Sequence, residues 1–232
     1  MTERSSFERM TNAEALRALY VDFEGEKDKT PVLLGVHRRG GSDRPHVHSH
    51  VMDAAFAWGA NVTSLHDAVL NVVMRAEKGD RRIVAWTEHE LKIVRTYLDE
   101  DPELVRRFEA RFANAKRLAE RWRNRLHGGD KPTDGRLASY LAHVRYEVPA
   151  EGAPGDVGET IRKLRATSPR GNALTALQVE RWRRLVEHNR HDCIGMRRLT
   201  LMATEALDDQ RPVPQRRVEQ ARVPVDRGQW TG

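Results

Sequence analysis

The chain has 232 residues, of which 39% are hydrophobic and 32% are charged. This length allows one domain with a substantial core, and no apolar run approaches the ~20 residues that a membrane-spanning helix needs. The formal net charge is +6 and the isoelectric point is about 9.8. A basic balance of this kind favours polyanionic partners such as nucleic acid, although it concerns association and not the fold.

Cysteine usage and the N-terminal sequence both bear on the compartment. Cys193 is the only cysteine, so no internal disulfide can form, which is typical of a reducing environment. The first residues are charged and lack the apolar segment of a secretory signal. We therefore expect a cytoplasmic protein.

The first part of the chain predicts a mixed sheet. Residues 17–24, 31–38 and 46–51 have the character of strands and are joined by short polar turns, so they predict an antiparallel meander. Residues 61–78 have the spacing of an amphipathic helix, and residues 81–86 predict a buried strand. A strand that follows a meander and a helix indicates a parallel pairing in the same sheet. The sequence therefore predicts an α/β fold with helices flanking a mixed β-sheet.

The second part of the chain is helical and basic. Residues 102–126 predict helical structure rich in arginine and lysine, and residues 102–170 as a whole predict a helical basic insertion. We expect this insertion to lie within a domain that spans residues 1–208. Residues 209–232 have no hydrophobic period and predict a flexible basic tail.

Two carboxylates lie two positions apart in the first predicted strand. Because side chains alternate along a strand, Asp22 and Glu24 point to the same face. Two acids on one face of a buried strand repel each other and lose solvation, and a divalent cation held between them relieves both costs. From these residues alone, a metal site and an edge strand with two solvated acids are equal alternatives.

Two later elements supply further acids. Glu90 lies at the start of the helix that follows the strand at 81–86, and Asp192 lies one turn after His188 on a long helix predicted over 172–208. His188 and Asp192 continue the apolar stripe of that helix, so they lie on its core-facing side. Four carboxylates that converge in this way would hold two Mg²⁺ or Mn²⁺ ions about 4 Å apart, with His188 as general base toward a water.

Four short segments resemble, in order, the motifs of the ribonuclease H-like DEDD superfamily. They are Asp-Phe-Glu-Gly at 22–25, Val-Ala-Trp-Thr-Glu-His-Glu-Leu at 84–91, a segment from 137 to 148, and His-Asn-Arg-His-Asp at 188–192. Within the superfamily they are most similar to the YprB-type branch, the predicted RecB-associated nucleases. The similarity spans about residues 17–207 of this chain.

The resemblance implies a ribonuclease H-like fold and a two-metal-dependent nuclease that hydrolyses phosphodiester bonds of DNA or RNA. It implies a 3′–5′ exonuclease-like activity that favours single strands, and it admits a helicase or a second nuclease as a partner. Two Mg²⁺ or Mn²⁺ ions are the implied cofactors. The implied metal ligands are Asp22, Glu24, Glu90 and Asp192. His188 would take the catalytic place of the tyrosine or histidine of the third motif.

Departures from the superfamily pattern leave alternatives open. Glu90 stands where most members have aspartate, and Glu88 is a competing candidate. Residues 108–127 are predicted to be helical where the family often has a short fifth strand, which is either reduced to residues near Phe112 or absent. These departures favour, as an alternative, a catalytically inactive nucleic-acid-binding module on the same fold.

A third alternative comes from alternating histidines. His46, His48 and His50 share one face of a short strand, as the ligands of a histidine-based metal hydrolase would. The polar, solvent-facing side of an edge strand explains the same pattern, and we favour it.

Overall fold

The computed structural model describes residues 10–38, 46–53, 56, 61–126, 132, 134–146, 156–167 and 175–208. It contains a five-stranded sheet in the order β3-β2-β1-β4-β5. The strands are β1 (Leu19–Glu24), β2 (Leu33–Arg38), β3 (His46–Val51), β4 (Ile83–Ala85) and β5 (Phe112–Asn114). The basic tail expected over 209–232 lies outside the described residues.

β1 is the central strand, with an antiparallel neighbour on one side and a parallel neighbour on the other. β1 pairs antiparallel with β2, and β2 pairs antiparallel with β3. β4 runs parallel to β1, and β5 runs parallel to β4. The expected antiparallel meander and mixed sheet are therefore confirmed, with two parallel strands where the sequence indicated one.

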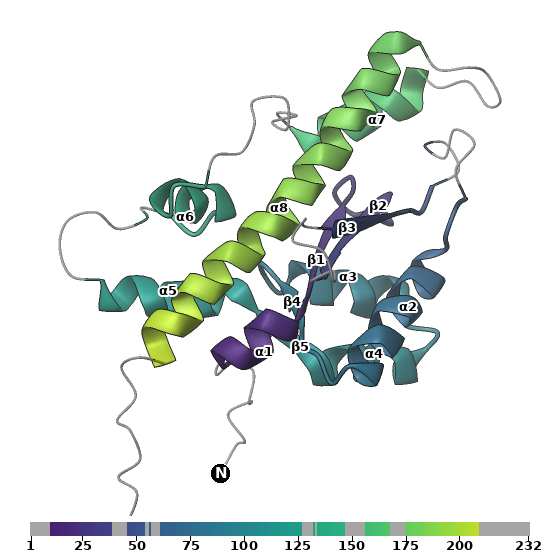
Figure 1. Cartoon of the computed structure of the whole chain (residues 1–232). Coiled ribbons are helices and arrows are strands. Elements are labelled where there is room, and N and C mark those ends of the chain that lie inside the picture. The colour runs from purple at the N-terminus through teal and green to yellow at the C-terminus, as the bar shows by residue number, and fades with distance from the viewer. Residues whose placement is uncertain are drawn as a thin grey trace, which may run out of the picture.

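Helices cover both faces of this sheet. They are α1 (Asn12–Arg17), α2 (Leu65–Lys78), α3 (His89–Tyr97), α4 (Pro102–Arg111), α5 (Ala115–Arg125), α6 (Leu137–His143), α7 (Val157–Thr167) and α8 (Ala176–Asp208). α2, α3 and α4 pack on one face, and α1, α5, α6 and the long α8 pack on the other (Figure 1). None of the helices within the described ranges has both the length and the apolar character of a membrane span.

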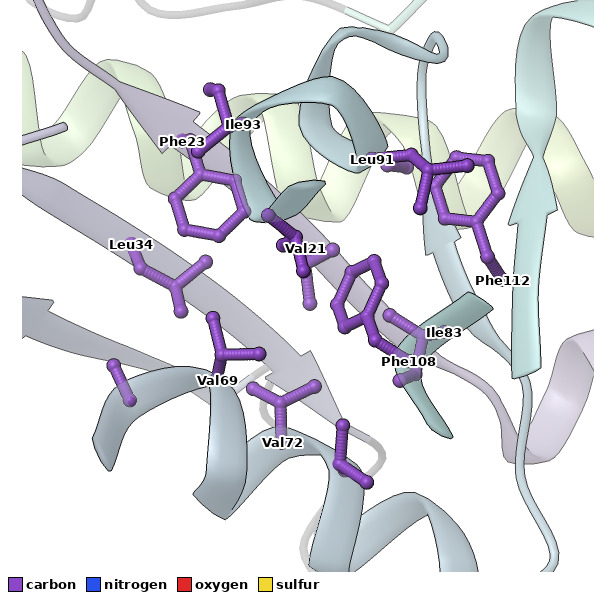
Figure 2. Packing of buried hydrophobic residues seen from close by; sticks show 14 of the residues in the cluster. Val21, Phe23, Leu34, Val69, Val72, Ile83, Leu91, Ile93, Phe108 and Phe112 are labelled. Atoms are coloured by element: carbon purple, nitrogen blue, oxygen red, sulfur yellow. The ribbon is translucent and has the colours of Figure 1, made fainter. Parts of the chain in front are cut away.

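The alternation of β1 assigns its residues to two different layers. Val21 and Phe23 point to the side of α2 and α4, where they join one buried cluster with Val69, Val72 and Phe108 (Figure 2). Each such side chain stabilises the fold by ~1.5–3 kcal/mol when it is fully buried.

The opposite face of β1 begins apolar and ends acidic. Tyr20 is fully buried in a second cluster that includes Met196 and Leu199 of α8. Asp22 and Glu24 follow on the same face, since they lie two and four residues further along the strand. α8 therefore crosses the two carboxylates with its residues 188–192 and the apolar region around Tyr20 with its later residues Met196 and Leu199.

The prediction of helical structure throughout residues 102–126 is wrong, because a short strand interrupts it. α4 ends at Arg111, and β5 then pairs in parallel with β4. Asn114 ends the strand and caps α5, because its side-chain oxygen accepts a hydrogen bond from the backbone N–H of Arg117 at 3.1 Å. This part of the expected helical basic insertion therefore supplies the edge strand of the sheet. The reduced fifth strand begins at Phe112, where the sequence allowed it.

Several smaller expectations also need correction. The residues before the first predicted strand, which the sequence marks only as polar, form α1, which begins with a capping box between Thr11 and Glu14. Three apolar residues at helical spacing in the predicted helices 61–78 and 172–208 are exposed instead of buried: Val62, Leu177 and Met202. Val62 precedes the first turn of α2, and Leu177 lies in the first turn of α8, so neither faces the sheet.

Gly35 allows α8 to lie directly against the sheet. It is the residue of β2 that pairs with Asp22 of β1. A Cβ atom at this position would lie 2.0 Å from Asn189 Oδ1 and 3.1 Å from Cys193 Sγ, and both of these atoms belong to α8. The close approach of helix and sheet therefore depends on the missing side chain.

We expect Gly35→Ala to lower the free energy of unfolding by ~1–3 kcal/mol, because the added methyl group overpacks a well-filled site. Urea denaturation measures the change. Gly158→Ala in α7 is the matched control, since its Cβ would meet no atom closer than 3.4 Å. Alanine there should be neutral or stabilise the protein by up to ~1 kcal/mol. Equal effects at the two glycines would contradict the proposed role of Gly35.

Candidate metal centre

The end of β1 and the middle of α8 bring three potential metal ligands together. Glu24, His188 and Asp192 each offer a ligand atom, and these atoms all lie within 4.8 Å of one another. His188 Nε2 lies 4.0 Å from Glu24 Oε1 and 3.5 Å from Asp192 Oδ2. This group can hold a metal ion. The sequence named Glu24 and Asp192 as metal ligands, whereas it named His188 as a general base and not as a ligand.

Asp22 lies beside this group and is held by α8. Its carboxylate is close enough to that of Glu24 for each to affect the pKa of the other. Asn189 Nδ2 donates to Asp22 Oδ2 at 2.8 Å and to the backbone oxygen of Asp22 at 3.0 Å. One amide therefore fixes both the backbone and the carboxylate of the central strand.

Glu90, rather than Glu88, is the buried acid of the second motif. Glu90 is only 6% exposed, and its Oε2 accepts hydrogen bonds from Thr87 Oγ1 at 3.1 Å and Thr87 N at 3.3 Å. Its charge raises the pKa values of Asp22 and Glu24, so it acts on the same centre. Glu88 is exposed and pairs with Arg117 Nη2 at 2.6 Å.

Burial raises the pKa values of all four acids, and repulsion from neighbouring acids adds to it at Asp22 and Glu24. Burial, with Asp192 as the next contributor, raises the pKa of Glu24 to about 8, and burial raises that of Glu90 to about 7. Burial also raises the pKa of Asp192. The pKa of Asp22 lies well above its ordinary value because of burial first and of its acidic neighbours next.

Lysine and arginine do not neutralise these carboxylates within the described residues. Across the described ranges, no lysine or arginine forms an ion pair with Asp22, Glu24, Glu90 or Asp192, and the basic side chains near Asp192 are the imidazoles of His188 and His191. Buried charges that lack partners are costly, and a group in this position either takes up a proton or binds a cation. The four carboxylates therefore lack neutralising positive charge, which bound metal ions would provide.

A cavity of about 530 Å³ opens beside Glu24. It lies between the turn that follows β1 and α3, and its lining includes three lysines, two further acids and a tyrosine: Lys27, Lys29, Lys92, Glu26, Asp28 and Tyr97. A carboxylate of the candidate centre thus forms part of the wall of a space lined by charged side chains of both signs and by Tyr97.

The alternating histidines of β3 form no comparable group. β3 is an edge strand, as expected, but His50 is buried, so a wholly solvent-facing histidine row is wrong. Burial, with His48 as the next contributor, lowers the pKa of His50 to about 4. Among side chains that the structure describes, which exclude that of His46, no potential metal-ligand group includes these histidines.

The sequence did not assign a site role to Asn189 or Gly35. Asn189 is completely buried, although its neighbours on α8 include the ligands of the centre. A polar residue on the core-facing stripe of a long helix was the available signal. Gly35 had no such signal, because only the crossing of α8 over β2 reveals why a side chain is excluded there.

Comparisons with known proteins find no matching family model, no matching curated protein and no matching solved structure. The site must therefore be interpreted from its own residues and geometry.

We expect the metal-free protein to lose stability as the pH rises from about 4.5 to about 8. The folded state raises the pKa of Glu24 to about 8 and that of Glu90 to about 7 from an ordinary value of 4.5. The folded state therefore binds more protons than the unfolded state within this window, and each group lowers stability by at most ~1.4 kcal/mol per pH unit. Urea denaturation in EDTA at several pH values measures the slope.

Glu24→Gln should flatten this pH dependence, because the amide cannot ionise. Glu88→Gln is the control, since Glu88 is exposed and lies outside the centre. A wild-type slope that is flat, or that rises with pH over this window, would contradict the electrostatic description of the site.

Proposed function

We propose that this chain is a two-metal-dependent nuclease on a ribonuclease H-like fold, with a 3′–5′ exonuclease-like activity on DNA or RNA. One observation carries the proposal. Four acids from β1, α3 and α8 act on one centre, and no lysine or arginine among the described residues pairs with them. The motif resemblance and the mixed sheet with its short fifth strand are compatible with this function.

The donor set fits Mg²⁺ or Mn²⁺. Carboxylate oxygens are hard ligands, which these cations prefer, whereas a site for softer metals would be rich in thiolate or imidazole. Cys193 is buried, and burial raises the pKa of its thiol well above its ordinary value, so it stays protonated and is a poor ligand. His188 is the one nitrogen donor of the compact group.

Each residue has a distinct role in the proposed reaction. Two bound divalent cations would supply an activated water and stabilise the charge on the leaving oxygen. The four carboxylates would hold these cations: Asp22, Glu24, Glu90 and Asp192. His188 would take or orient the proton of the attacking water, because its Nε2 lies between Glu24 and Asp192. Asn189 would keep Asp22 in position.

The cavity beside Glu24 supports a nucleic-acid substrate. Phosphate groups pair with lysine ammonium groups, and bases stack on aromatic side chains, a combination suited to single strands. Lys27 borders the cavity from the β1–β2 turn and Lys92 borders it from α3. Tyr97 of α3 is the aromatic side chain in the lining on which a base would stack. The overall net charge of +6 favours the same class of partner.

A catalytically inactive nucleic-acid-binding module is the second candidate. Both donor groups of Thr87 bind Glu90 Oε2, so one oxygen of this acid already has two partners in the protein. If those hydrogen bonds hold Glu90 away from a cation, the chain would bind nucleic acid without cleaving it.

Metal binding should raise the melting temperature of the wild-type protein. A cation present at about 100 times its dissociation constant stabilises the folded state by ~2.7 kcal/mol. Differential scanning fluorimetry with Mn²⁺ and with EDTA tests this. Asp192→Asn should abolish the shift, and in EDTA it should melt above the wild type because one repelling charge is gone. A shift of equal size in Asp192→Asn would contradict the site.

We expect Mn²⁺-dependent degradation of end-labelled single-stranded DNA or RNA. Asp22→Asn and Glu90→Gln should lower the rate by more than ~100-fold, since even residues that only orient metal ligands cost ~10–100-fold. Glu88→Gln should retain the wild-type rate, because Glu88 is exposed and paired with Arg117.

The same assay separates the two candidate functions. Retained binding of the labelled strand without cleavage under Mg²⁺ or Mn²⁺ would identify the inactive module. Cleavage that survives in Asp22→Asn would place the reaction elsewhere in the chain.

A further inference from the structure

A second cavity, of about 330 Å³, lies at the opposite end of the sheet from Glu24. Residues from three separate segments line it: Glu14 and Arg17 of α1, residues 80–82 before β4, and residues 110–111 at the end of α4. α1 and the loop before β4 precede two parallel strands, so they lie where those strands begin, whereas Glu24 lies where β1 ends. Figure 1 shows α1 and α4 at this end of the molecule.

Four of the residues that line this cavity are arginines, from parts of the chain that are distant in sequence. They are Arg17, Arg81, Arg82 and Arg111. The same cavity contains two carboxylates, those of Glu14 and Asp80, so its lining carries a formal charge of +2. An excess of half-enclosed guanidinium groups is costly without anions, because like charges repel where solvent is partly excluded.

The carboxylates leave most of the guanidinium donors unused. Arg82 is bound through Nε alone, to Glu14 Oε1 at a long 3.4 Å, and its side chain is only 23% exposed. Arg111 uses Nη1, which donates to Asp80 Oδ1 at 3.1 Å and to the backbone oxygen of Arg81 at 3.3 Å. An arginine has five N–H donors. The remaining donors of these two arginines have no protein acceptor within the part of the chain that the structure describes.

Glu14 cannot move closer to Arg82 without losing another role. Its Oε2 accepts hydrogen bonds from Thr11 N at 2.8 Å and Thr11 Oγ1 at 3.0 Å, which complete the capping box of α1. Asp80 is 86% exposed, so its attraction for Arg111 is screened by water. The two acids therefore neutralise the arginines that line the cavity only in part.

We propose that this cavity, which we call the arginine pocket, binds a phosphate group. Guanidinium forks match phosphate oxygens in bidentate geometry, and the unused donors of Arg82 and Arg111 supply two such forks. A volume of about 330 Å³ would hold about ten waters, so the pocket admits more than a single small ion. The phosphate comes either from a nucleic-acid backbone that extends beyond the reaction centre or from a small phosphorylated molecule.

This site is independent of the proposed nuclease function. It uses none of the four acids of the metal centre and needs no metal ion. Binding can therefore be measured in EDTA, where the nuclease is inactive.

Isothermal titration of the full chain with inorganic pyrophosphate, in EDTA and low salt, tests the proposal. We expect Arg82→Gln and Arg111→Gln each to weaken pyrophosphate binding by at least tenfold. Arg106→Gln is the matched control: it removes the same charge from α4, but Arg106 is exposed, pairs with Glu103 and lies outside the pocket. It should bind as the wild type does.

The melting temperature of each variant, measured without ligand, shows whether the variant is folded. If Arg82→Gln or Arg111→Gln unfolds, the double variant Arg17→Gln and Arg81→Gln replaces it, because these arginines make no side-chain ion pair in the described residues. Absence of pyrophosphate binding to the wild type, or equal weakening in Arg106→Gln and the pocket variants, would overturn the proposal.

A second titration, with a labelled single-stranded oligonucleotide in EDTA, separates the two sources of phosphate. If the pocket receives the nucleic-acid backbone, pyrophosphate will compete with the oligonucleotide and the pocket variants will bind it more weakly. If it receives a small molecule, the pocket variants will lose pyrophosphate binding alone. Asp22→Asn should bind pyrophosphate normally, so failure of the nuclease proposal and failure of this one give different results.

Discussion

The contact between Asn189 of α8 and Asp22 of β1 is the interaction on which the rest of the structure depends. One buried amide donates to both the backbone and the carboxylate of the central strand, so it sets where the helix crosses the sheet. Gly35 makes the contact possible, because any side chain at that position would occupy the space of the amide. Once α8 is fixed here, His188 and Asp192, one residue before and three residues after Asn189, must lie over the end of β1. The close packing of helix and sheet thus assembles the candidate metal centre.

This centre gathers charge that the protein itself does not neutralise. Glu24 and Glu90 are almost fully buried, and repulsion adds to burial in raising the pKa of Glu24. The surrounding hydrophobic clusters on both faces of the sheet hold the acids together despite this repulsion. In the metal-free state these repelling carboxylates lower the free energy of unfolding. Such a loss of stability is common at functional sites. The bound cations of the proposed function would remove the repulsion.

The two ends of the sheet have opposite electrostatic character. Where β1 ends, carboxylates converge and the neighbouring cavity carries lysines; where β1 and β4 begin, four arginines surround the arginine pocket. Parallel pairing of β1 with β4 produces this separation, because it places both strand starts at one end of the molecule. The lining of the cavity beside Glu24 has as many acids as lysines, whereas the lining of the arginine pocket carries an excess of two positive charges.

The sequence by itself determined the local pattern of the fold and most of the candidate site. Alternation in β1 placed Asp22 and Glu24 on the same face of that strand. Helical spacing placed His188 and Asp192 on the same face of α8. Both periodicities follow from backbone geometry alone. It could not decide between Glu88 and Glu90, two positions apart near a helix start, until the packing of α3 buried one and left the other paired with Arg117. It left open whether a reduced fifth strand near Phe112 exists, since a strand of three residues is too short to interrupt a helical pattern clearly. Tertiary structure decided the choice of Glu90 and the presence of β5. It also decided the roles of Asn189 and Gly35. Each of these depends on which segment, distant in the sequence, packs against the residue in the fold.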